Sequence, residues 1–197
     1  MIRRVVNSLR DFGAAETLCM VLHRLRIISF RHTFSVFIKD LDSLENSGAA
    51  LAEAGKEKTR LTFREIFQDE LADFEFPEEM YSKETLQEHF RRGYRFFAAL
   101  KENQIVSING VHTRSAHWAY IGKSLVRLPE NWVYFNFALT VPASRNQRIG
   151  SVLRQYTLRT VRQEGYQTML AAAFIENKKA AYWHVSNRFE CGGLLLT

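Results

Sequence analysis

The amino-acid sequence predicts a mixed α/β (α+β) fold: a mostly antiparallel central sheet flanked by helices, with an amphipathic helix at the N-terminus. Three observations support this. Apolar residues recur at helical spacing between residues 5 and 28. Two extended runs joined by a short turn predict a hairpin over residues 94–112. From residue 132 onward a strand, a helix, a second strand and a second helix follow one another.

Composition and charge divide the chain into two parts. Of its 197 residues 46% are hydrophobic and 24% charged, which excludes disordered, collagenous and disulfide-rich proteins. The two cysteines, Cys19 and Cys191, have no C-x-x-C spacing, which argues against a thiolate metal site. Residues 1–39 carry seven basic and two acidic side chains, so they hold most of the net charge of +6. We predict a basic helical arm over residues 1–32 and a folded domain over residues 33–197.

The arm places apolar residues on one helical face and basic residues on much of the other. Such a helix can pack on its own domain or a partner subunit, or lie on an anionic membrane surface, and the sequence leaves these alternatives open. It contains no secretion signal and no apolar run long enough to cross a bilayer. We therefore expect a cytoplasmic protein, with peripheral contact to the inner membrane surface left open.

The first half of the folded domain contains a strand, a loop and two helices. Apolar and polar residues alternate over residues 34–39, which predicts a strand. Residues 42–60 are expected to form a loop or an exposed helix, and residues 62–71 and 82–92 to form helices. Ser82 is the expected N-cap of the second helix, and Gly93 follows its end. The acidic segment over residues 69–79 is either a solvated loop or a wall that attracts a cationic substrate.

The second half of the domain is richer in strands. Strands are expected over residues 94–101 and 105–112, and again over residues 132–140. A helix follows from residue 149 to about residue 165, then a buried strand over residues 168–174 and a helix over residues 177–185. Hairpins followed by this alternating tail account for the predicted mixed sheet.

The segment from Ala138 to Leu153 is the most informative one for function. Its strand stops at Pro142 and turns directly into a helix. The first turn of a helix has unpaired N–H groups and a partial positive charge, and two arginines lie beside it here. From these residues alone the segment is either a phosphate cradle or an ordinary strand-to-helix connection with solvated arginines.

This segment resembles the pyrophosphate loop of the GNAT superfamily of acyl-CoA-dependent N-acyltransferases, whose pattern is Arg/Gln-x-x-Gly-x-Gly/Ala. Arg145 and Gly150 match the first and last defining positions, whereas Arg148 replaces the first glycine. The resemblance implies that acetyl-CoA or another acyl-CoA is the co-substrate and that this loop holds its pyrophosphate. The implied coenzyme-binding residues of the loop are Arg145, Asn146, Gln147, Arg148, Ile149, Gly150 and Ser151.

A second match lies downstream, where the family has an Asn, an Ala three residues on, often a Tyr seven on, and a Gly-Phe ending. Asn177, Ala180, His184 and Phe189 take those places, with Arg188 in place of the glycine. The resemblance covers residues 94–193 well, and it looks like bacterial members of unassigned substrate. It implies that Asn177 hydrogen-bonds the coenzyme, a role compatible with capping a helix. Few residues follow Phe189, so the family's final hairpin is either short or completed by another chain, which leaves a homodimer open.

Acyl transfer from a thioester to an amine needs a neutral amine, a stabilised oxyanion and a proton for the departing thiolate. The resemblance implies that backbone N–H groups of Leu139, Thr140 and Val141 stabilise the oxyanion. His184 stands at the family's usual acid position and is expected to titrate near neutrality, with Tyr182 as the alternative acid. The candidates for the general base are Glu176, Glu130, His112 and His117.

We therefore predict an N-acyltransferase that moves an acetyl or longer acyl group from acyl-CoA to a primary amine by direct attack in a ternary complex. The acceptor is a small-molecule or polymer-linked amine, and neither a metal nor a nucleic acid is expected. The alternative is a non-catalytic binding module of the same fold, which docks on a membrane surface or an acidic partner through the basic arm. In that case Arg148 and Arg188 mark a lost or altered coenzyme site, so acyl-CoA binding discriminates between the two.

Overall fold

The computed structural model describes residues 33–44, 61–76, 82–113, 118–121, 124–174, 177–186 and 188–196. The basic arm and most of residues 42–60 lie outside these ranges, so their predicted structure and the division into arm and domain stay predictions. The elements in chain order are β1 (Thr33–Asp40), β2 (Leu61–Ile66), η1 (Asp69–Asp73), α4 (Lys83–Arg91), β3 (Tyr94–Lys101), β4 (Gln104–His112), β5 (Trp118–Ile121), β6 (Ser124–Arg127), β7 (Trp132–Thr140), η2 (Pro142–Ser144), α5 (Ile149–Gln163), β8 (Thr168–Phe174), α6 (Lys178–Ser186) and β9 (Glu190–Leu196).

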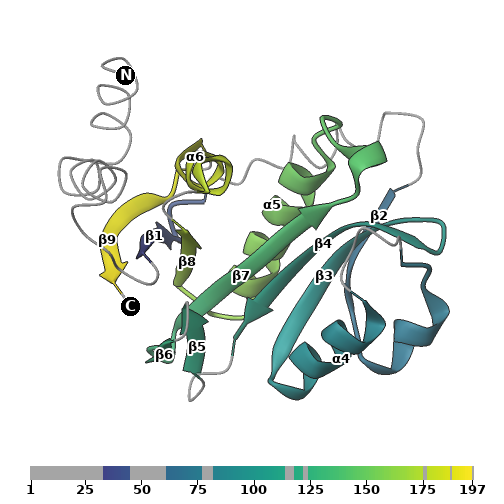
Figure 1. The fold of residues 1–197 in the computed structure, drawn as a ribbon, viewed down its shortest axis with the longest axis horizontal. Coiled ribbons are helices and arrows are strands. Elements are labelled where there is room, and N and C mark those ends of the chain that lie inside the picture. The colour runs from purple at the N-terminus through teal and green to yellow at the C-terminus, as the bar shows by residue number, and fades with distance from the viewer. Residues whose placement is uncertain are drawn as a thin grey trace.

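Seven of the described strands form one sheet in the order β2-β3-β4-β7-β8-β1-β9, and β5 and β6 form a separate small hairpin (Figure 1). Every neighbouring pair in the large sheet is antiparallel except β7 and β8, which run parallel. The predicted mixed, mostly antiparallel sheet is therefore confirmed for the described residues.

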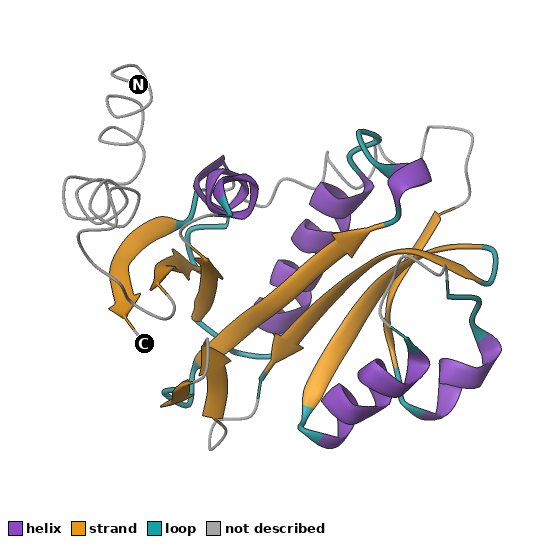
Figure 2. Cartoon of the chain, in the orientation of Figure 1, coloured by secondary structure: helices purple, strands orange, loops and turns teal. Residues whose placement is uncertain are grey.

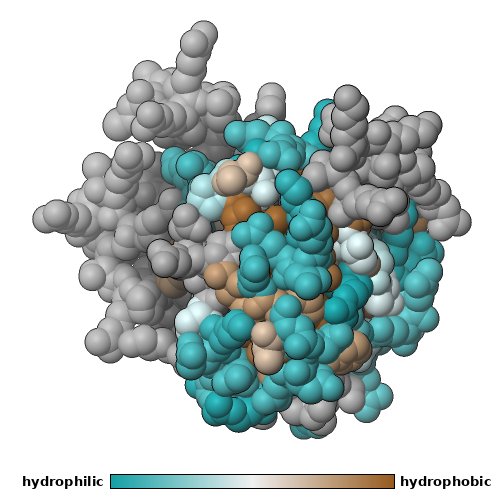
Figure 3. Space-filling view, turned by 90° about the vertical axis from the view of Figure 1, so that its right-hand side faces the viewer, coloured by the Kyte–Doolittle hydropathy of each residue, from teal (hydrophilic) through white to brown (hydrophobic). Residues whose placement is uncertain are grey.

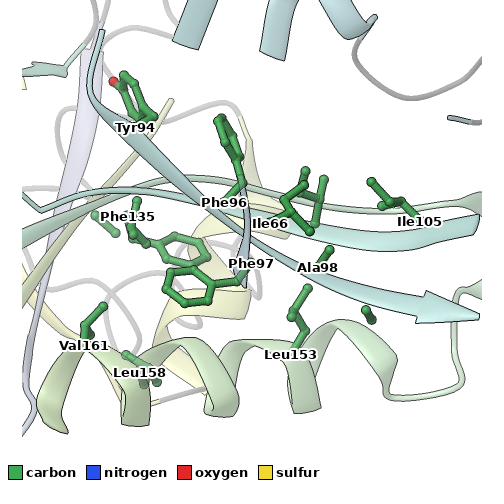
Figure 4. Packing of buried hydrophobic residues seen from close by; sticks show 14 of the residues in the cluster. Ile66, Tyr94, Phe96, Phe97, Ala98, Ile105, Phe135, Leu153, Leu158 and Val161 are labelled. Carbon is green, nitrogen blue, oxygen red and sulfur yellow. The ribbon is translucent and has the colours of Figure 1, made fainter. Parts of the chain in front are cut away.

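Helices cover both faces of this sheet (Figures 2 and 4). Because side chains alternate along a strand, Phe96 and Phe97 of β3 point to opposite faces. The Phe96 ring lies 4.7 Å from that of Phe90 on α4, and the Phe97 ring lies 6.2 Å from that of Tyr156 on α5. The core therefore has two layers, with the apolar stripe of α5 packed on one side of the sheet. The buried residues of that stripe are Ile149, Val152, Leu153, Leu158 and Val161.

The helix predicted over residues 62–71 is wrong. Residues 61–66 form β2, which pairs with β3 from Leu61 opposite Lys101 to Ile66 opposite Phe96, and the 3₁₀ helix η1 follows it. The segment contains β-branched and aromatic residues, and pairing with β3 supplies the backbone hydrogen bonds that a helix would have made internally. Pairing with β3, which the local sequence pattern does not show, therefore decides that this segment is a strand and not a helix.

The other predicted elements in the described ranges are confirmed to within a few residues. Ser82 caps α4 through its Oγ, which accepts a hydrogen bond from the N–H of Thr85 at 3.3 Å, and Gly93 follows with φ +87°. Beyond Phe189 the described residues form one strand, β9, which pairs with β1 of the same chain, where Thr33 lies opposite Leu196.

The described surface seen from the right-hand side of Figure 1 is mostly hydrophilic (Figure 3). The exposed large hydrophobic residues of the described ranges are Phe67, Phe174 and Tyr182. None of the helices in these ranges has the length and apolar character that a membrane-spanning segment needs.

Candidate functional site

The parallel strands β7 and β8 pair over half of their length and then part. Their pairing runs from Trp132 opposite Thr168 to Phe135 opposite Ala171. Just beyond it the register between β4 and β7 shifts by one residue, so that Asn136 is an extra residue in β7. One edge of β7 is therefore open from Asn136 to Thr140, while the end of β8 pairs only with β1. We call this gap between the two strands the split.

A row of unsatisfied backbone donors lies beside the Thr140 end of the split. In the part of the chain that the structure describes, the N–H groups of residues 146–151 donate no hydrogen bond to a backbone or side-chain acceptor. Two residues of the row, Asn146 and Arg148, have left-handed backbones with φ of 63° and 59°. Successive N–H groups in such a turn form an anion-binding concavity, and the partial positive charge of the 15-residue helix α5 adds to it. This cradle fits a phosphate group.

Side chains of the predicted loop hold the cradle in shape. The Nε of Arg145 donates to the carbonyl of Thr140 at 3.1 Å, and the Nε2 of Gln147 donates to the carbonyl of Ala143 at 3.0 Å. Arg148 and Ser151 are exposed, whereas Ile149 is buried. The structure therefore brings the predicted loop residues together around one row of donors, and two of these residues are exposed arginines.

Gly150 permits close packing between α5 and β7. A Cβ atom at this position would lie 2.8 Å from the Oγ1 of Thr140. That hydroxyl is itself held in place, because it lies 2.9 Å from the Oγ of Ser107, which donates to the carbonyl of Leu139 at 3.0 Å. The glycine therefore allows a close approach between two elements of the chain. Ser107 was not predicted from the sequence.

The three backbone donors predicted for the oxyanion do not face the same way. The N–H of Val141 donates to the carbonyl of Val106 in β4 at 3.0 Å, so it is committed to the sheet. N–H directions alternate along a strand, so that of Leu139 also faces β4 and that of Thr140 faces the split. Thr140 is the one member of the predicted set whose N–H points at the open edge.

Asn177 caps α6. Its Oδ1 accepts a hydrogen bond from the N–H of Ala180 at 3.1 Å, as expected of an N-cap residue. The capping role that the sequence allowed is confirmed, and the contact of Asn177 with a coenzyme stays a prediction.

His184 is almost fully buried. Its side chain is 5% exposed and its ring stacks on that of Phe37 at 4.8 Å. Burial lowers the pKa of His184 to about 3, and the charge of Arg154 acts in the same direction. The ring is therefore uncharged at neutral pH, whereas we expected it to titrate there. Its catalytic role stays a prediction.

Three of the other acid and base candidates fall within the described residues: Tyr182, Glu130 and His112. Tyr182 is 65% exposed, and a spacing of two residues turns it away from His184 on the helix. Glu130 is exposed just before β7, at the opposite end of that strand from Thr140. His112 is buried at the end of β4, with its Nε2 3.0 Å from the carbonyl oxygen of Arg92. Two further candidates fall outside the described residues: Glu176 and His117.

The structure reveals one functional candidate that the sequence analysis missed, the fully buried Arg154 on α5. Its guanidinium carbon lies over three aromatic rings, at 3.6 Å from the centroid of Trp183, 4.4 Å from that of Phe189 and 4.9 Å from that of Phe135. The signal was present in the sequence, because position 154 falls within the apolar stripe of a helix that should bury it.

One cavity of the described residues does not belong to the split. A cavity of about 330 Å³ lies between the loop over residues 141–149 and the strands β2, β3 and β4, and no residue of β8 or α6 lines it. Within the described ranges, no three His, Cys, Asp or Glu side chains converge in a way that could hold a metal ion, and the expectation that no metal takes part stays a prediction.

The model of the acetyltransferase (GNAT) family matches residues 62–185. Among solved structures, aminoglycoside N-acetyltransferase AAC(6′)-Iy in complex with CoA is 12% identical, with a TM-score of 0.53 over 72% of this chain and 96% of that one. The same enzyme with a bisubstrate analog of CoA and monomethyl-acetylneamine is 14% identical, with a TM-score of 0.53 over 71% and 97%. AAC(6′)-Ih from Acinetobacter baumannii is 14% identical, with a TM-score of 0.50 over 70% and 95%. No curated protein matches the chain. At these identities the structural likeness shows the fold alone.

Proposed function

Because this chain belongs to the acetyltransferase (GNAT) family, we propose that it transfers an acetyl or longer acyl group from acyl-CoA to a primary amine. The cradle of six unsatisfied N–H groups at the start of α5, beside the split, is the observation that carries the proposal. Any helix leaves its first N–H groups without an intrahelical partner, but here the row begins before the helix, where the left-handed residues Asn146 and Arg148 shape it into an anion-binding turn.

The cradle suits the pyrophosphate of coenzyme A, because it offers several N–H donors, the positive end of a helix and the guanidinium groups of Arg145 and Arg148. The open edge of β7 beside it suits the pantetheine arm. That arm contains amide groups, which can hydrogen-bond to an unpaired strand edge as a peptide does. Asn177 at the start of α6 is the further proposed contact.

In the proposed reaction the amine nitrogen attacks the thioester carbonyl directly in a ternary complex. The C–N bond forms, the C–S bond breaks, the nitrogen loses one proton and the thiolate gains one. The N–H of Thr140 supports the oxyanion from the open edge of β7. A thiol with a pKa near 8.5 needs little help to leave, so a neutral His184 acts as a hydrogen-bond donor, and Glu176 is the proposed base.

The proposed acceptor is a small-molecule amine, because the neighbours of this fold include enzymes whose structures contain amine substrates or analogs. A polymer-linked amine remains compatible with a basic arm. The acidic segment gives no support for an acceptor site, because Glu70 forms an ion pair with Arg64 at 2.9 Å and η1 follows β2, three strands away from β7. A cytoplasmic location, with membrane contact through the arm, stays part of the proposal. The family match gives no support to a non-catalytic binding module.

Calorimetric titration of the purified chain with acetyl-CoA tests the proposal. We expect micromolar binding in the wild type, weaker binding in Arg145→Ala and none in Gly150→Trp, which fills the space beside the cradle. Arg91→Ala is the matched control, because it removes an exposed arginine on the opposite face of the sheet. Absence of heat with acetyl-CoA and with longer acyl-CoAs in a folded wild type would overturn the proposed function.

A further inference from the structure

Arg154 is a buried cation, and among the described residues its one hydrogen-bonding partner is a histidine. Its side chain is 0% exposed, and its Nε and Nη1 atoms have no hydrogen-bond partner among the described residues. Its Nη2 lies 3.2 Å from the Nδ1 of His184. Burying a guanidinium costs free energy unless it is paired, so the hydrogen bond to His184 matters for both side chains.

The hydrogen bond between the two side chains decides where the histidine proton is. A guanidinium has donors and no acceptor, so the Nδ1 of His184 must be the acceptor of this bond. A neutral imidazole carries its single proton on the other nitrogen, which is Nε2. We infer that Arg154 is a positioning residue, which holds the His184 ring in the one tautomer that presents an N–H at Nε2.

The pair lies at the base of the split. Phe135 is the last residue of β7 that pairs with β8, the Arg154 guanidinium lies 4.9 Å from the centroid of its ring, and the His184 ring lies 6.4 Å from it. A donor fixed at this point serves the thiolate that leaves when the acyl group is transferred. The catalytic part of the inference rests on the proposed function, whereas the tautomer does not.

Burial and the charge of Arg154 keep the His184 ring neutral. A further cation, Lys39 of β1, lies behind Phe189: its Nζ is 5.8 Å from the centroid of the Phe189 ring, which lies 5.2 Å from the His184 ring, and it donates to the carbonyl of Arg188 at 3.4 Å. Burial lowers the pKa of Lys39, and the charges of Arg154 and Arg188 lower it further, which shows that the three cations act on one another. Asp40 is the one acidic group that opposes them at Lys39. A second positive charge on His184 is therefore disfavoured, and its Nε2–H donor persists as the pH changes.

An NMR experiment that resolves the two ring nitrogens of His184 tests the tautomer directly. In the wild type we expect the His184 resonances of a neutral ring protonated at Nε2, unchanged between pH 5 and pH 8. In Arg154→Met, which still fills the aromatic cage, we expect the two nitrogens to move toward the averaged positions of mixed tautomers and the ring to titrate at higher pH. Arg188→Met is the matched control, because it removes a nearby charge without touching Nδ1, and it should leave the tautomer unchanged.

A wild-type ring protonated at Nδ1, or one that titrates near pH 6.5, would overturn the inference. This measurement needs no variant, so the inference is tested even if Arg154→Met does not fold. An unchanged tautomer in a folded Arg154→Met would show that Arg154 only packs. For the catalytic part, we expect Arg154→Met and His184→Gln each to lower kcat about tenfold with little change in KM, and the double variant to lose no more than either single one. Full additivity would contradict this part. Failure of the wild type to bind any acyl-CoA refutes the proposed function and leaves the tautomer result standing.

Discussion

Replacement of Gly150 by alanine tests the packing of the candidate coenzyme loop against the sheet. The new Cβ would lie 2.8 Å from the Oγ1 of Thr140, closer than such atoms can approach. Thr140 cannot turn away freely, because its hydroxyl is hydrogen-bonded to the Oγ of Ser107 at 2.9 Å. Either the helix start shifts or this hydrogen bond breaks.

The expected cost follows from three contributions. Overpacking in a well-packed site costs about 1–3 kcal/mol, and a lost hydrogen bond costs about 1 kcal/mol. Replacing glycine by alanine inside a helix returns about 0.5–1 kcal/mol. We therefore expect Gly150→Ala to lower the free energy of unfolding by about 1–3.5 kcal/mol, seen as an earlier urea midpoint with an unchanged m-value.

A second background identifies the contact that causes the loss. In Thr140→Ala the obstructing hydroxyl is absent, so Gly150→Ala should there be neutral or stabilising by up to about 1 kcal/mol. Ser151→Ala, at the exposed neighbouring position, should change stability by less than about 0.5 kcal/mol. An equal loss in both backgrounds, or no loss in either, would refute the reasoning.

Two further predictions concern backbone strain and pH. Arg148 has φ 59°, so Arg148→Gly should relieve left-handed strain and raise the free energy of unfolding by up to about 1 kcal/mol, whereas Arg148→Ala, which removes the same charge, should not; equal midpoints in urea would contradict this. His184 has a pKa of about 3 in the folded chain and about 6.5 when unfolded, so the unfolded state binds more protons between these values and stability is lost as the pH falls through them. Urea unfolding at several pH values between 4 and 6 should give a slope steeper by about 1.4 kcal/mol per pH unit in the wild type than in His184→Gln, and equal slopes would refute the neutral ring.

The sequence predicts a helix or strand well where the segment itself contains capping residues or a regular apolar pattern. The helix α4 has a capping serine, a glycine after its end and an apolar stripe, and all three act as expected. The same holds for β3, β4, β7 and α5, whose periods are long and regular. The predicted helix over residues 62–71 failed because pairing with β3, some 35 residues later, outweighs a short and ambiguous pattern.

The part of the candidate site that is formed by backbone N–H groups could be predicted from the sequence. The part in which side chains from distant segments meet could be predicted less well. The cradle lies in the short connection between β7 and α5, so its residues could be named from the sequence. The state of His184 depends on Arg154, 30 residues away, and on Phe37, almost 150 residues away. No local pattern reveals that these groups enclose the ring, and so an ordinary pKa was expected for it.

The place of β1 in the sheet has a consequence for how the chain is made. This strand is synthesised before every other described strand, yet both of its neighbours come last: Phe34 pairs with Phe174 in β8 and with Leu195 in β9. On the ribosome the first strand must wait, unpaired, until nearly the whole described chain has emerged. Closing so long a loop costs entropy, and an unpaired strand invites association with other chains. The split is bordered on one side by β8, whose only other neighbour in the sheet is β1, and so we expect the site to be completed only after synthesis of the last strand ends.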